Sequence, residues 1–187
     1  MPINLPNLVT LLRIVLIPLI VGVFYLPDAW LSDFGKNFAA TAIFIVAAVT
    51  DWLDGYLARK LNQMSAFGAF FDPVADKLVV VGALIVLLTL GRVDMVVGLI
   101  IVGREIVISA LREWMAQLGQ SKSVAVATIG KLKTTLQMVA IPLLLYEDPL
   151  FGIDCNALGT VMIYIAAVLT VVSMLYYLRR ALPLLRG

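Results

Sequence analysis

The sequence predicts an all-α fold: a polytopic integral membrane protein with six transmembrane helices. Of its 187 residues, 62% are hydrophobic and 14% are charged, whereas soluble domains are about half apolar and about one quarter charged. The mean hydropathy is +1.03. One membrane crossing takes roughly 20 apolar residues, so six crossings would use about 120 residues of the chain. We therefore expect residues 1–187 to form a single membrane domain with short loops.

Polar and turn-forming segments divide the apolar sequence at regular intervals. In order, the apolar stretches cover residues 5–26, 37–58, 69–90, 95–117, 124–146 and 157–178, each about the length of one span. The first stretch carries Arg13 and has no small-residue cleavage site, so we expect a span and not a cleaved signal peptide. The dividing segments are Leu26-Pro27-Asp28, Leu61-Asn62-Gln63, Gly91-Arg92-Val93-Asp94, Gly119-Gln120-Ser121 and Glu147-Asp148-Pro149.

Basic residues gather at one set of alternating helix ends, and acidic residues dominate the other set. Because cytoplasmic loops are enriched in lysine and arginine, both termini and the loops near residues 60 and 120 are expected to be cytoplasmic. The basic residues on this side are Arg59, Lys60, Lys77, Arg112, Lys122, Lys131, Lys133, Arg179, Arg180 and Arg186.

The composition excludes several kinds of chemistry. The chain has no histidine, which removes histidine-dependent triads, histidine-ligated zinc and imidazole acid–base catalysis. Its single cysteine, Cys155, excludes an intrachain disulfide and a thiolate-cluster metal site. Any reaction must therefore use carboxylates, lysines, arginines and hydroxyl groups.

Half of the twelve acidic residues lie in or beside apolar helices, where an uncompensated carboxylate is costly. For Glu113 the adjacent Arg112 and the cytoplasmic surface are sufficient explanation. Four aspartates within 26 residues are harder to explain by solvation. The six acidic residues are Asp51, Asp54, Asp72, Asp76, Glu105 and Glu113.

The spacing of the four aspartates predicts that they converge. Asp51 and Asp54 are three residues apart, hence neighbours on one face of a helix, and Gly55 and Ala58 share that face. On the next stretch Gly68, Asp72 and Asp76 recur every four residues. Pro73 either opens that helix, with Asp72 as its N-cap, or kinks it.

Four carboxylates in a low-dielectric site would repel one another unless cations neutralised them. Two divalent ions balance the charge, and oxygen ligands favour Mg²⁺ or Mn²⁺. Two such ions can bridge the oxygens of a pyrophosphate, so the predicted chemistry is phosphoryl transfer at the membrane surface.

The eight residues Asp51, Asp54, Gly55, Ala58, Arg59, Gly68, Asp72 and Asp76 read D-x2-D-G-x2-A-R-x8-G-x3-D-x3-D. This pattern resembles the signature of the CDP-alcohol phosphotransferases, six-helix membrane enzymes of phospholipid synthesis. The segments 5–13, 103–105 with Arg112, and 130–137 resemble the bacterial inner-membrane branch that joins CDP-diacylglycerol to glycerol 3-phosphate. The resemblance also implies a homodimer.

The resemblance further implies residue roles. Asp51, Asp54 and Asp72 would ligate two Mg²⁺ or Mn²⁺ ions, and Asp76 would be a further ligand or the general base. Gly55, Ala58 and Gly68 would leave room for the cytidine diphosphate, while Arg59 would contact phosphate or pair with the aspartates. Asn7, Thr10 and Arg13 share one face of the first helix, where Arg13 would meet a nucleotide phosphate or extend to the membrane surface.

A basic site is expected for the phosphate of the acceptor: Arg112, Lys131 and Lys133. The two lysines are not neighbours on a regular helix, so the chain there is unwound or one of them reaches elsewhere. Arg104 and Glu105 would form a buried structural pair or a wall of the acceptor pocket, and we leave Glu105 out of the catalytic set.

Aromatic residues near the span ends are expected to form interfacial belts and not base-stacking platforms, so no nucleic-acid partner is expected. They are Trp30, Trp114, Tyr146, Tyr176 and Tyr177. Three other functions remain open: the same reaction with serine, inositol phosphate or phosphatidylglycerol as acceptor; an intramembrane prenyltransferase; and a divalent-cation transporter.

Overall fold

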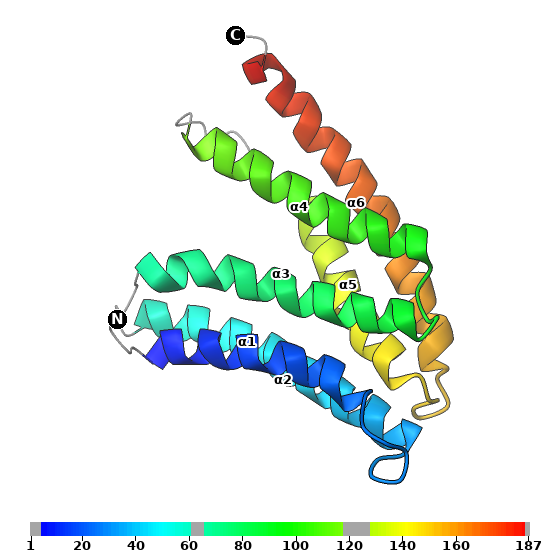
Figure 1. The fold of residues 1–187 in the computed structure, drawn as a ribbon. Coiled ribbons are helices and arrows are strands. Elements are labelled where there is room, and N and C mark those ends of the chain that lie inside the picture. The colour runs from blue at the N-terminus through cyan, green and yellow to red at the C-terminus, as the bar shows by residue number, and fades with distance from the viewer. Residues whose placement is uncertain (1–4, 61–65, 118–127, 186–187) are drawn as a thin grey trace.

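The computed structural model describes residues 5–60, 66–117 and 128–185, which form six α-helices and no strand. In chain order these are α1 (Leu5–Val23), α2 (Asp33–Lys60), α3 (Ala66–Thr89), α4 (Met95–Gln117), α5 (Thr128–Tyr146) and α6 (Cys155–Leu185). The all-helical prediction is confirmed. Figure 1 shows that successive helices run in opposite directions, so the turns 24–32, 90–94 and 147–154 lie at one end of the bundle.

Side-chain caps set where three of the helices begin. The Ser32 hydroxyl accepts a bond of 3.3 Å from the backbone N–H of Gly35, which lets α2 begin several residues before its apolar run. Asp94 and Asp154 do the same for α4 and α6, through the N–H groups of Val96 at 2.8 Å and Ala157 at 2.9 Å. Hydropathy alone places these boundaries only approximately, because capping side chains are polar.

A glycine ends α3. Gly91 has φ +70°, and the N–H of the next residue, Arg92, bonds back to the carbonyl of Leu87 at 2.9 Å. This is the left-handed helix termination that favours glycine. Pro73 lies inside α3, so Asp72 is not the N-cap of that helix.

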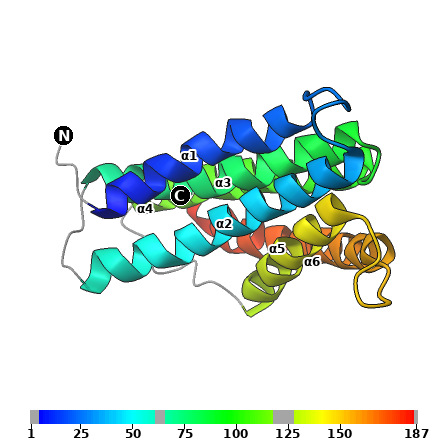
Figure 2. The same ribbon diagram turned by 90° about the horizontal axis from the view of Figure 1, so that it is seen from below.

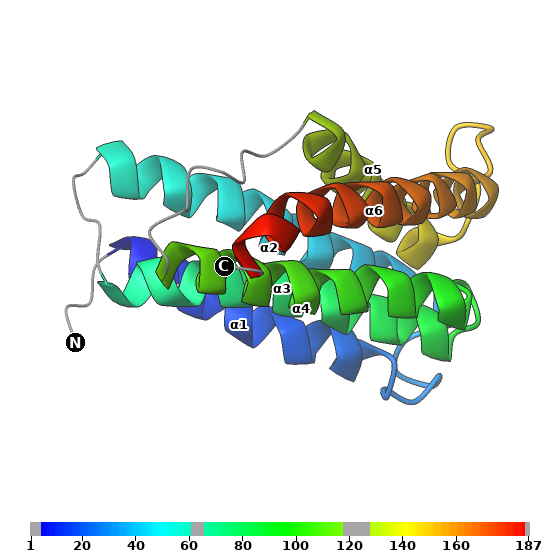
Figure 3. The same cartoon turned by 90° about the horizontal axis from the view of Figure 1, so that it is seen from above.

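Every helix packs against at least two others around a common core. α1 contacts α2 and α3, α5 contacts α6 and α2, and α4 contacts α6 and α3. Figure 2 shows α2 between α1 and α5, and Figure 3 shows α6 with α4 on one side and α5 on the other. Six buried residues, one from each helix, represent the core: Ile20, Phe44, Leu84, Ile101, Ile141 and Ile163.

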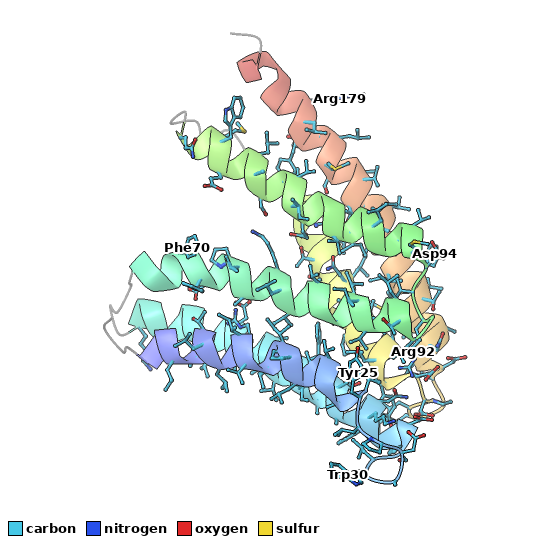
Figure 4. The ribbon with its side chains drawn as sticks, in the orientation of Figure 1. Tyr25, Trp30, Phe70, Arg92, Asp94 and Arg179 are labelled. Atoms are coloured by element: carbon cyan, nitrogen blue, oxygen red, sulfur yellow. The ribbon has the colours of Figure 1, made fainter. Side chains whose placement is uncertain are left out.

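The outside of the bundle is strongly apolar. Exposed side chains include Val49, Phe70, Leu99 and Val168, from four different helices. A water-soluble bundle would bury such residues, so this surface suits membrane association. Figure 4 shows Tyr25 and Trp30 at the end of the bundle that carries the turn at Arg92, with Phe70 and Arg179 toward the other end.

Among the described residues, two helical segments are long and apolar enough to cross a membrane by themselves: Asp33–Asp51 and Cys155–Arg179. Shorter apolar segments lie in α1 (Leu8–Val23) and α5 (Leu132–Tyr146). In α3 and α4, charged residues such as Asp76 and Arg104 interrupt the apolar sequence. Six spans therefore remain a prediction, because the charges of the candidate site lower the hydropathy of the helices that carry them.

Arg92 joins three elements at the end of the bundle opposite the candidate site. Its guanidinium donates to the carbonyls of Leu144 and Leu145 at 3.2 and 2.9 Å and to the Asn37 side chain at 2.9 Å, and it pairs with Glu147. Burial lowers the pKa of Arg92, and the nearby carboxylates, Glu147 first among them, act in the opposite direction. The α3–α4 turn is thereby fixed to α2 and to the carboxyl end of α5.

Candidate active site

Buried polar residues form a level of their own beside the core. They include Thr10, Arg13, Arg104, Lys133 and Gln137. Along α1, α4 and α5 these residues lie between the core and the end of the bundle where α1 begins and α6 ends, whereas the buried Lys36 and Asn37 lie at the other end, on α2. Figure 1 shows α4 and α6 diverging from α3 toward the end where α1 begins. Polar side chains from several helices thus face one another inside an otherwise apolar bundle.

Helix α1 holds the carboxylates of α2 and α3 together. One nitrogen of Arg13, Nη1, donates to Asp51 at 3.0 Å and also pairs with Asp76. One turn earlier on α1, the Thr10 hydroxyl donates to Asp72 at 2.7 Å. Asp51 and Asp76 therefore meet at Arg13, while Asp72 is held by Thr10 one turn away on α1.

Arg13 is 1% exposed, while the side chains of Asp51 and Asp76 are 47% and 43% exposed. A buried guanidinium needs opposite charge close by, and the two carboxylates provide it. The carboxylates keep access to water and ligands. Arg13 therefore bonds to carboxylates within the bundle and does not extend to the membrane surface.

Several expected site residues lie on described helices but have side chains outside the described part of the structure. Gly68 is described and is buried on α3. Within the described side chains, no group of three or more acidic or cysteine residues is arranged to hold a metal ion. The four-carboxylate metal site therefore remains a prediction. The residues whose side chains are outside the description are Asn7, Asp54, Gly55, Ala58, Arg59, Arg112 and Lys131.

A cavity of about 480 Å³ lies between the helices at this level. Residues from all six helices line it, and they include both carboxylates and basic residues of the expected site. Arg13, Asp51 and Asp76 line it from α1, α2 and α3, which we call the acidic wall. Arg104, Glu105 and Lys133 line it from α4 and α5, which we call the basic wall. A single cavity thus brings the carboxylates within the same enclosure as buried basic groups.

The basic wall depends on α4 and α5. Lys133 is 2% exposed and donates to Glu105 at 3.1 Å, and Arg104 donates to the same Glu105 oxygen at 2.6 Å. α5 is helical at both Lys131 and Lys133, so the unwound segment that their spacing allowed is not found. Arg104 and Glu105 form the buried pair considered from the sequence, and they also line the cavity.

The structure corrects one expectation and adds residues to which the sequence analysis gave no role in the site. Tyr177 is 1% exposed and lines the cavity, so it is not part of an interfacial belt. Its neighbour Tyr176 is exposed, because adjacent residues of α6 point to different faces. Thr134 and Gln137 also line the cavity. In the sequence, the polar Gln137 within an apolar stretch was the feature that could have indicated a place in the site.

An apolar hollow of about 330 Å³ lies next to the polar cavity, between α2 and α5. Ala48 and Met138 line both spaces, so the two are adjacent. The remaining residues that line the hollow, Phe44, Ile45, Val49 and Pro142, are all apolar. The site therefore combines carboxylates, buried cations and an adjoining hydrocarbon-like surface.

The chain is similar to known proteins over most of its length. A family model described as CDP-alcohol phosphatidyltransferase matches residues 3–172. Proteins from Shigella flexneri serotype 5b (strain 8401) and Escherichia coli (strain K12), both named CDP-diacylglycerol--glycerol-3-phosphate 3-phosphatidyltransferase, are similar to the chain. Each is 50% identical to it, over 97% of this chain and 96% of the relative. The chain belongs to the CDP-alcohol phosphatidyltransferase family.

Proposed function

We propose that this protein transfers the phosphatidyl group of CDP-diacylglycerol to sn-glycerol 3-phosphate, releasing CMP and forming phosphatidylglycerophosphate. The relatives described above are named for CDP-diacylglycerol and glycerol 3-phosphate. The observation that carries the proposal is the shared cavity, which Asp51, Asp76, Arg104 and Lys133 all line. A reaction that joins a pyrophosphate substrate to a phosphorylated alcohol needs both kinds of wall.

Two divalent ions, Mg²⁺ or Mn²⁺, would be held by Asp51, Asp54, Asp72 and Asp76. Divalent metal ions are typical of the family. The described residues fit such ions, because Asp51 and Asp76 already converge on a single positively charged nitrogen of Arg13. Carboxylate oxygens are the ligands that these hard cations prefer. When bound, the ions would neutralise the pyrophosphate oxygens and make the phosphorus more electrophilic.

The transfer itself needs no covalent intermediate with the protein. The glycerol 3-phosphate hydroxyl oxygen bonds to the phosphorus that carries diacylglycerol, and the bond from that phosphorus to the bridging oxygen breaks, so CMP leaves. The hydroxyl proton passes to Asp76. An aspartate beside Arg13 is a weak base, but the proton becomes acidic as the new O–P bond forms.

The nucleotide would bind along α1, α2 and α3. Gly55, Ala58 and Gly68 have almost no side chain and leave space for it, and Asn7, Thr10, Arg13 and Arg59 would contact its phosphates or ribose. Thr10 and Arg13 bond to the aspartates in the structure. We propose that these two residues position the aspartates and the nucleotide relative to each other. The hollow between α2 and α5 would take an acyl chain of the same substrate.

The acceptor phosphate would bind at the basic wall, through Lys133 with Arg112 and Lys131. Lys133 is the member of this set whose side chain is described, and it is buried at the cavity and not solvated at the surface. Lys133 and Arg104 share one carboxylate, Glu105, so this buried group keeps one positive charge in excess. A buried excess charge is costly unless a ligand of opposite sign balances it. A phosphate ester is such a ligand, which favours a phosphorylated acceptor over serine.

We further propose six spans in the bacterial inner membrane, with both termini and the cavity toward the cytoplasm, and a homodimer as the assembled form. The helix ends nearest the cavity carry Lys60 and Arg179, in line with the positive-inside rule. The opposite end carries exposed Tyr25 and Trp30, which suit a membrane interface (Figure 4).

The test is CMP release from CDP-diacylglycerol by the purified protein, with a set of acceptors. We expect release with glycerol 3-phosphate, little with serine, inositol phosphate or phosphatidylglycerol, and none once a chelator has removed divalent ions. Product identification by mass spectrometry links CMP to phosphatidylglycerophosphate. If serine supports release and glycerol 3-phosphate does not, the proposed acceptor is wrong.

A further inference from the structure

Glu105 connects two buried cations at the wall of the cavity. Its Oε1 atom accepts a hydrogen bond from Arg104 at 2.6 Å and one from Lys133 at 3.1 Å. The glutamate side chain is 22% exposed, while Arg104 is 8% and Lys133 is 2% exposed. One carboxylate on α4 therefore fixes its own neighbour and also a lysine that comes from α5.

This contact compensates for a weakness of lysine as a ligand. Lysine has a flexible stem of four carbons, so the position of its amine is poorly fixed. Its charge is strongly hydrated, so burial disfavours the protonated form. A carboxylate at hydrogen-bond distance favours the charged form and restricts the stem. Because an ammonium group carries three N–H donors, Lys133 can bond to Glu105 and to a phosphate at the same time.

The charged residues that line the cavity divide into two groups of different net charge. Arg104 and Lys133 with Glu105 carry a formal charge of +1, from two cations and one carboxylate. Arg13 and Lys77 with Asp51 and Asp76 carry no net charge, from two cations and two carboxylates. A phosphate dianion that enters the cavity would be attracted to the group that Glu105 organises.

We propose that Glu105 is a positioning residue for the acceptor: it holds Lys133, charged and correctly placed, for the phosphate of glycerol 3-phosphate. This rests on the function proposed above. Glu105 does not itself touch substrate, so its loss weakens acceptor binding through Lys133. Binding of CDP-diacylglycerol, which involves the opposite wall, is independent of it.

The test uses purified full-length protein and compares Glu105→Gln, Lys133→Met and the double variant. For Glu105→Gln we expect the KM for glycerol 3-phosphate to rise by roughly tenfold, the loss of one charge-assisted contact. The KM for CDP-diacylglycerol and kcat at saturating acceptor should stay within about twofold of wild type. The double variant should have the same acceptor KM as Lys133→Met, because both changes remove one interaction.

Glu113→Gln is the matched control, the same change at an exposed glutamate of the same helix. If Glu105→Gln does not fold, comparison of the double variant with Lys133→Met still decides. An unchanged acceptor KM in Glu105→Gln, an equal rise for both substrates, or multiplied effects in the double variant would overturn the inference. Wild-type protein that releases no CMP with glycerol 3-phosphate would instead refute the proposed function.

Discussion

Arg13 and Asp76, which are 63 residues apart in the chain, form an ion pair between α1 and α3. The same Arg13 nitrogen also donates to Asp51 of α2. One fully buried cation therefore lies between two carboxylates of the family motif. A divalent ion that binds these carboxylates must compete with Arg13 or shift it.

Removing this guanidinium should make the fold depend on divalent ions. In Arg13→Gln, Asp51 and Asp76 lose their shared counter-charge and repel each other. Because both are half exposed, we expect a loss of only about 1–2 kcal/mol, seen as a lower thermal unfolding midpoint without metal. Added Mg²⁺ should raise that midpoint more in Arg13→Gln than in wild type, since the ions replace the missing charge.

Arg179→Gln provides the control, because it makes the same change at an exposed position on α6. It should have the wild-type midpoint with and without Mg²⁺. An equal Mg²⁺ effect in Arg13→Gln and wild type would show that Arg13 and the ions do not share a site.

Asp76→Asn should abolish turnover and leave the protein folded. The amide keeps the shape of the side chain but cannot accept the acceptor's proton, and loss of a general base costs about 10²–10⁴-fold in rate. CMP release measures the activity, and size-exclusion chromatography with thermal unfolding measures the fold.

The matched change is Asp94→Asn, at the first turn of α4, where asparagine caps a helix as well as aspartate does. It should retain wild-type turnover. Folded Asp76→Asn that keeps more than a tenth of the wild-type rate would contradict the role assigned to Asp76.

Arg92→Met should lower stability and spare catalysis. The substitution leaves the carbonyls of Leu144 and Leu145 and the side chain of Asn37 without the donor they now have. We expect a loss of about 2 kcal/mol, or several degrees in the unfolding midpoint. The kcat per folded molecule should not change, because Arg92 does not line the cavity.

Asp28→Asn tests the specificity of that effect at the same end of the bundle. The Asp28 side chain is 83% exposed, and its partner Lys36 also lies 3.8 Å from Asp33, so Lys36 keeps a carboxylate nearby when Asp28 is changed. Its midpoint should match wild type. If Arg92→Met unfolds at the wild-type temperature, the bonds from Arg92 to α2 and α5 do not stabilise the fold.

The sequence predicted the order of the helices and the approach of Asp51 to Asp76, because both follow from spacing along one chain. Helical periodicity puts residues on a face but does not name the partner of that face. The Lys133–Glu105 bond and the burial of Tyr177 depend on how α4, α5 and α6 pack, so the sequence did not reveal them. The end of α6 also differs from the apolar pattern. The helix continues through Arg179 to Leu185, because arginine has a high helix propensity although it is not apolar.

The central claim is that aspartates of α2 and α3 bind a pair of divalent ions in the cavity. Its most direct measurement is Mn²⁺ binding to the purified protein, with free Mn²⁺ followed by electron paramagnetic resonance. We predict two ions per chain in wild type, and fewer or much weaker sites in Asp51→Asn and in Asp72→Asn. Wild-type stoichiometry and affinity in both variants, or no Mn²⁺ binding by the active wild-type protein, would contradict the claim.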